Sequence, residues 1–136
     1  MAKPIAKLIF CDNIKVERNG DDVNSSISNI LSMLQPVNIP GNYSFCVACI
    51  FNNIDTSKKN TTQFIFKDEN GNIVFDTDSL SFPDINLSDS KNNSPTTIQL
   101  NLDLRNIILQ SEGTYSAELI LNGDIVAKDT ILVKKV

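Results

Sequence analysis

Cys46 and Cys49 have the residue type and spacing of a C-x-x-C pair, which occurs in redox centres and zinc sites. A redox pair needs its first thiol exposed at a helix N-terminus, where the dipole lowers the thiol pKa. Residues 43–51 instead alternate like an apolar strand, so the two side chains are expected on opposite faces. A zinc site needs two further ligands, and the chain offers only Cys11 and no His. The pattern therefore predicts buried structural cysteines.

Asp76, Asp78 and Asp84 have a D-x-D-x5-D spacing that resembles the third calcium loop of C2 domains, which are β-sandwiches of this size. Clustered carboxylates suit a hard cation that prefers oxygen ligands. A C2 site also takes acids from a second loop, and only Asp21 and Asp22 are candidates for that role. A solvated turn explains the same residues, so a calcium-dependent C2-like module stays an alternative.

The sequence offers few other residues that could carry out catalysis. Without His, a Ser or Cys nucleophile lacks its commonest base, and the five glycines form no phosphate-binding pattern. Arg18 and Arg105 are the only arginines, which disfavours a phosphate clamp. We therefore expect no enzyme, no catalytic residues, no cofactor and no bound metal. A carbohydrate-active or carbohydrate-binding sandwich stays a further alternative, although without Trp only Tyr43 and Tyr115 carry a phenol ring for stacking.

Composition limits the number of domains, the classes of partner and the location that we expect. The chain has 136 residues, a net charge of −4, 41% hydrophobic and 21% charged residues, which predicts one folded domain over residues 1–136. The negative charge argues against a nucleic-acid partner, and no apolar stretch approaches the ~20 residues of a membrane span. An odd number of cysteines without a secretory signal favours the cytoplasm. Abundant Asn, Ile and Lys, which have AT-rich codons, suggest a low-GC bacterium or its phage.

Short apolar blocks with period two, separated by Asn, Asp, Ser, Gly and Pro, predict an all-β chain. The best-defined strand is residues 43–51, with apolar side chains on both faces, as expected for a central strand. Asn-Gly pairs predict two hairpins, at residues 64–75 and 115–133. Residues 6–12, 14–17 and 97–104 also alternate, and 28–34 fits a strand or a helix, with strand preferred. Loops are expected at 19–26, 52–61 and 84–95.

Residues 109–117 resemble the entry to strand F of immunoglobulin-like domains, where a Tyr hydroxyl bonds to backbone a few residues upstream. Tyr115 takes that position, and Ala117 stands where antibody domains have a disulfide cysteine. The resemblance implies an antiparallel immunoglobulin-like β-sandwich of about 7–9 strands.

The order of turns and strands along the whole chain is similar to a family of small uncharacterised bacterial proteins, a domain of unknown function. The residues that carry the resemblance are 8–12, 38–40, 64–71, 112–115 and 121–124. The family supplies no activity, cofactor or site residue to transfer.

These observations together favour a non-catalytic binding or assembly module. Sandwich sheets have exposed edges that a protein must protect or use. The expected partner is an unidentified protein, or a second copy of the chain, bound through a sheet edge or face. Residues 131–136 are one candidate edge, although Lys134 and Lys135 would equally blunt it.

Overall fold

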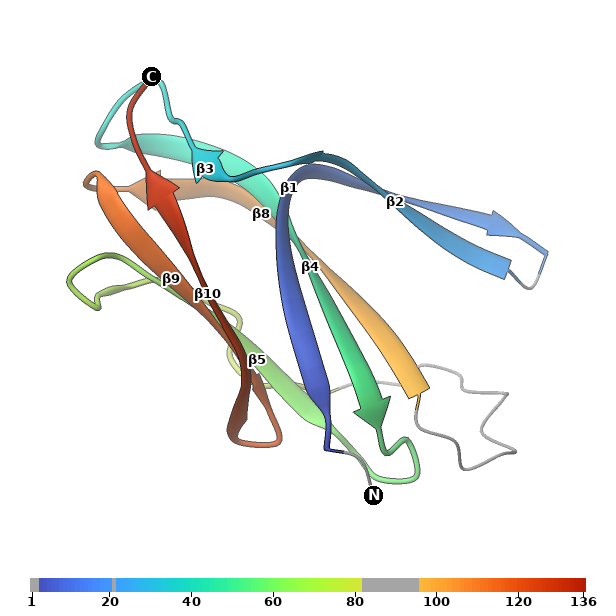
Figure 1. Ribbon diagram of the computed structural model, residues 1–136. Helices are drawn as coiled ribbons and strands as arrows, with labels where there is room; N and C mark the ends of the chain where they lie inside the picture. The colour runs from blue at the N-terminus through green and yellow to red at the C-terminus, as the bar shows by residue number, and fades with distance from the viewer. Residues whose placement is uncertain (1–2, 21, 82–95) are drawn as a thin grey trace.

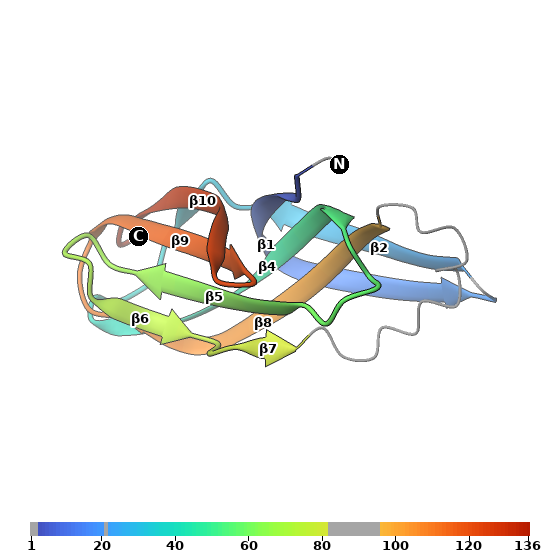
Figure 2. The ribbon, with the colours of Figure 1, turned by 90° about the horizontal axis from the view of Figure 1, so that it is seen from below.

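The computed structural model describes residues 3–20, 22–81 and 96–136, and the regular structure of these residues is entirely β-strand. Two sheets face each other (Figures 1 and 2), so the predicted all-β sandwich is confirmed at this level. The four-stranded sheet has the order β2 (Asp22–Ile30), β1 (Ile5–Asn19), β4 (Gly41–Ile54), β8 (Thr96–Leu109). The other sheet has the order β3 (Met33–Leu34), β10 (Asp124–Val133), β9 (Gly113–Leu121), β5 (Thr61–Lys67), β6 (Ile73–Asp76), with β7 (Leu80–Ser81) also paired to β5.

Strand β4 is the central strand that its alternation predicted, because it lies between β1 and β8. One of its faces enters the core through Phe45, Val47, Cys49 and Phe51. On its other face Cys46 and Ala48 are also buried, although they lie outside that core.

Aromatic rings join the two sheets at the middle of the sandwich. Phe66 of β5 lies between three rings, with centroid distances of 6.3 Å to Phe10, 5.7 Å to Phe45 and 5.4 Å to Tyr115. The rings are tilted relative to one another, which is a favourable arrangement for aromatic pairs. This cluster fixes the distance between the sheets and holds β1 against β5 and β9.

Both predicted hairpins are present. Strands β5 and β6 are joined through Gly71 at φ +85°, and β9 and β10 are joined through Asn122 and Gly123 at φ +51° and +88°. Asn and Gly are the residues that adopt positive φ at least cost, so the local chemistry of the turns determined both connections.

Several predicted boundaries were wrong. The loop expected at residues 19–26 is mostly strand, because residues 24–26 of β2 pair with residues 15–17 of β1. Gly20, which has φ +65°, follows the end of β1 at Asn19. Residues 52–54, also expected in a loop, complete β4, and β8 continues five residues beyond its predicted end at residue 104. The ambiguous segment 28–34 contributes strand residues to β2 and β3, as preferred, and the loop expected at 84–95 lies outside the described residues.

The C-terminal edge proposed from the sequence is already occupied. Leu132 and Val133 pair in parallel with Met33 and Leu34, and the backbone N–H of Lys134 donates to the Leu34 carbonyl at 3.0 Å. Residues 131–136 therefore do not form a free edge. In the part of the chain that the structure describes, no helix is long and apolar enough to cross a membrane.

The bond expected of Tyr115 is confirmed. This residue is fully buried, and its hydroxyl donates to the Ser111 carbonyl at 2.8 Å. The bond joins the start of β9 to the turn before it, and the ring belongs to the aromatic cluster.

Replacing Tyr115 by Phe should lower the free energy of unfolding by about 1 kcal/mol, because the ring stays and only the buried hydroxyl bond is lost. Urea denaturation measures the change. Tyr43→Phe is the matched control, since among the described residues the Tyr43 hydroxyl has no hydrogen-bond partner, and it should change stability much less. Equal effects of the two substitutions would show that the Ser111 bond contributes nothing.

Candidate functional site

Strand β1 changes partner halfway along its length. Residues 5–11 pair with β4, and residues 11–19 pair with β2, with Cys11 in both registers. Beyond Cys11 the β1–β2 ribbon leaves the body and extends past the end of the other sheet (Figures 1 and 2). We call residues 12–20 and 22–30 the arm.

The arm has one apolar and one polar face. Ile14 and Ile27 are direct cross-strand partners and only half-buried, while Val16 on the same face is 47% exposed. On the opposite face Lys15 and Glu17 form a 3.2 Å ion pair, with both side chains more than half exposed. Such a pair contributes at most about 1 kcal/mol. A two-stranded ribbon with these contacts is marginally stable in water by itself.

The outer edge of β2 is the least protected edge among the described strands. No described strand pairs with it on the side away from β1. Its nine residues include neither Pro nor Lys, the residues that commonly block strand addition, and Asp22 is its only charged residue. An edge of this kind is a template for pairing with another chain.

The other edges are blocked in different ways. Strand β10 has a bulge between Ile125 and Ala127 and carries Lys128 and Asp129 along its free part. On β8 the pairing is interrupted opposite Tyr43 and Phe45, and next to this point an Asp103–Arg105 ion pair of 2.8 Å lies on the strand. Strand β6 has only four residues. These features are the ones by which sheet edges resist strand addition.

A set of close contacts fixes the root of the arm to the body. The Leu31 N–H donates to the Phe10 carbonyl at 2.8 Å, and the Asn29 amide donates to the Asp12 carboxylate at 3.0 Å. Beneath these contacts is a cavity of about 340 Å³ between β1, β10 and residues 30–32. Its only carboxylate is Asp129, so the described residues place no acid pair there for general acid–base chemistry.

The cysteines lie where the sequence predicted, buried in strands and without disulfides. Cys49 faces the core, where burial raises the pKa of its thiol to about 12. Cys46 faces the other side and its thiol donates to Asp103 at 3.5 Å, while the Cys11 thiol donates to the Cys46 carbonyl at 3.7 Å. Burial raises the pKa of both thiols, and raised values disfavour the nucleophilic thiolate.

The acidic residues proposed for calcium are only partly within the described chain. The Asp76 carboxylate accepts bonds from the Gln63 amide and from the Asp78 N–H, both at 2.8 Å, so it stabilises a local turn. Asp84 and Asp21 lie outside the described residues. Residues 3–20, 22–81 and 96–136 contain no cluster of three His, Cys, Asp or Glu residues that would hold a metal ion.

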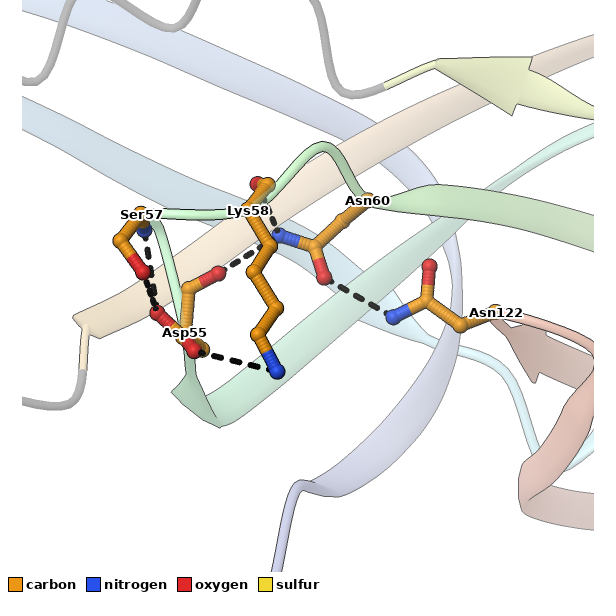
Figure 3. A network of polar contacts seen from close by, with 5 residues as sticks. All are labelled: Asp55, Ser57, Lys58, Asn60 and Asn122. Carbon is orange, nitrogen blue, oxygen red and sulfur yellow. Dashed lines mark hydrogen bonds and ion pairs between the residues drawn. The ribbon is translucent and has the colours of Figure 1, made fainter.

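A polar network missed from the sequence joins the β4–β5 loop to the β9–β10 turn (Figure 3). The buried Asn60 amide donates to the carbonyls of Asp55 and Lys58 at 2.9 and 3.1 Å. Its oxygen accepts from the Asn122 amide at 2.9 Å, and the Asn122 oxygen accepts from the Thr61 N–H at 2.8 Å. Hydrogen bonds from Ser57 lower the pKa of Asp55 at the edge of the network. Because these amides bond to the protein itself, the network has a structural role.

Asn60→Ala should therefore destabilise the fold by about 2 kcal/mol, because it removes both bonds that the buried amide donates to backbone carbonyls. A urea-denaturation cycle with Asn122→Ala and the double variant should give a coupling energy of about 1 kcal/mol. The positive φ of Asn122 penalises Ala equally in both backgrounds, so this cost cancels in the cycle. Additive effects would contradict a direct Asn60–Asn122 bond.

The family of the chain follows from its similarity to known proteins. The model of a family of unknown function, DUF6941, matches residues 7–134. The chain belongs to this family. The match confirms the resemblance to an uncharacterised family that the turns and strands indicated. Since residues 7–134 include the whole arm and all of both sheets except the first two residues of β1, the arm is part of the DUF6941 domain and not an addition to it.

No curated protein matches this DUF6941 chain. Among solved structures, it resembles the Pseudomonas fluorescens alkylpurine DNA glycosylase AlkC bound to DNA containing an abasic site analog, with 9% identity and a TM-score of 0.46. The alignment covers 95% of this chain and 30% of the glycosylase chain. A likeness at this level carries no argument about function.

Proposed function

We propose that the chain is a non-catalytic, immunoglobulin-like β-sandwich that serves as a protein assembly module. Its place would be the cytoplasm of a low-GC bacterium or its phage, as the composition suggests. The partner is a protein that adds an extended strand to the β2 edge of the arm, rather than a nucleic acid or a membrane. The Tyr115–Ser111 bond supports the immunoglobulin-like assignment.

The single observation that carries the proposal is the outer edge of β2, which no described strand pairs, on a ribbon that projects from the body. Strand addition satisfies the free N–H and C=O groups of an edge strand and gives specificity through alternate side chains. The half-buried Ile14 and Ile27 would then gain neighbours on the apolar face of the arm. The protection of the β8 and β10 edges directs addition to β2.

The alternatives gain no comparable support. Both turn bonds of Asp76 go to its Oδ1, so this oxygen is already engaged within the chain. The Tyr115 ring is fully buried, so it is not available to stack on a sugar. Both points favour the assembly module.

A photo-crosslinking amino acid at position 25, on β2, should form an adduct with a protein in cells of the organism that encodes the chain. The same group at position 130, on the free part of β10, is the control and should form little adduct, because that edge is bulged and charged. Mass spectrometry identifies the crosslinked protein and the attached residue. Absence of an adduct at position 25, or equal yields at both positions, would contradict the proposal.

A further inference from the structure

We propose that the strand added to the β2 edge is β2 of a second copy, paired antiparallel about a two-fold axis centred on Ser25. This inference rests on the proposed function and names its partner. It joins two four-stranded sheets edge to edge through their arms.

The register follows from where β2 is regular. Asn29 has a left-handed φ of +54° and its position is missing from the β1–β2 register, so the regular pairing covers residues 22–28. The centre of that stretch is Ser25. Pairing the whole stretch with its symmetry copy therefore places Ser25 opposite Ser25, Asn24 opposite Ser26, and Asp22 opposite Ser28.

The charge pattern of β2 permits this self-pairing. Opposed like charges destabilise neighbouring strands. In this register the single acid of β2, Asp22, lies opposite Ser28 and at the far end of the interface from its own symmetry copy. Lys15 and Glu17 are already paired with each other on β1, one strand away from the axis. This register therefore places no two charged residues of β2 opposite each other.

Self-pairing would also stabilise the arm. A lone two-stranded ribbon is marginal, whereas three or more strands with a shared apolar face are stable. The four strands formed by two arms would carry Ile14, Val16 and Ile27 from each copy on one face. Each arm supplies the two further strands that the other arm lacks. The same residues are used on both copies, as a closed two-fold interface requires.

The test uses opposite charges at the axis. Ser25→Lys places two ammonium groups opposite each other, and Ser25→Asp places two carboxylates there, so each should raise the dimer Kd on the order of tenfold or more. An equimolar mixture of the two variants should recover a dimer at least as tight as the unmodified chain. Sedimentation velocity of the full chain measures mass and Kd across a concentration series.

Asn24→Lys is the matched control. It adds the same charge one residue away, but Asn24 pairs with Glu17 within the chain and faces Ser26 of the second copy. Its dimer Kd should change less than threefold. Thermal melting of all three variants checks that each is folded.

Four outcomes would overturn the inference: an unmodified chain that stays monomeric up to millimolar concentration, a dimer unaffected by Ser25→Lys, equal weakening by Asn24→Lys, or no recovery on mixing. The failure of this inference can be told apart from the failure of the proposed function. An adduct from position 25 to a different protein would retain strand addition at β2 and reject only the second copy.

Discussion

The structure depends on the point at which β1 leaves β4: residues 5–11 pair with β4, and the remaining residues of β1 do not, although β4 itself continues to Gly41. Backbone N–H and C=O groups need hydrogen-bond partners, and a strand that diverges from its neighbour must find another. The chain meets this requirement by returning through β2, which pairs with the second half of β1. Cys11, which is paired in both registers, marks the point where β1 leaves the sandwich and the arm begins.

The two halves of β1 are stabilised by different forces. In the body, Leu8 and Phe10 are buried against the opposite sheet, and the aromatic cluster around Phe66 contributes hydrophobic burial that no other contact replaces. In the arm, backbone pairing is supported by a few half-exposed apolar contacts and one solvent-exposed ion pair. Under the proposed function, a partner strand would supply the stability that this ribbon lacks by itself.

Local patterns were sufficient where local chemistry decides the structure. The alternation of residues 43–51 predicted both faces of β4, two Asn-Gly pairs located their hairpins, and Tyr115 was assigned its backbone bond. The arm could not be predicted in the same way. Asn24, Ser25 and Ser26 have the composition of a loop, and only pairing with β1 makes them strand. Edges likewise depend on long-range register, which is why residues 131–136 were one candidate for a free edge and are instead paired.

The most direct measurement of the central claim is amide hydrogen exchange of residues 22–28 in the full chain as a function of protein concentration. If a partner strand stabilises the arm, these amides should be protected at high concentration and should exchange faster on dilution, while amides of the β4 core stay protected throughout. Protection of β2 that is the same at every concentration would show that the arm is stable alone. Exchange at unprotected rates at every concentration would show that no second copy pairs with it.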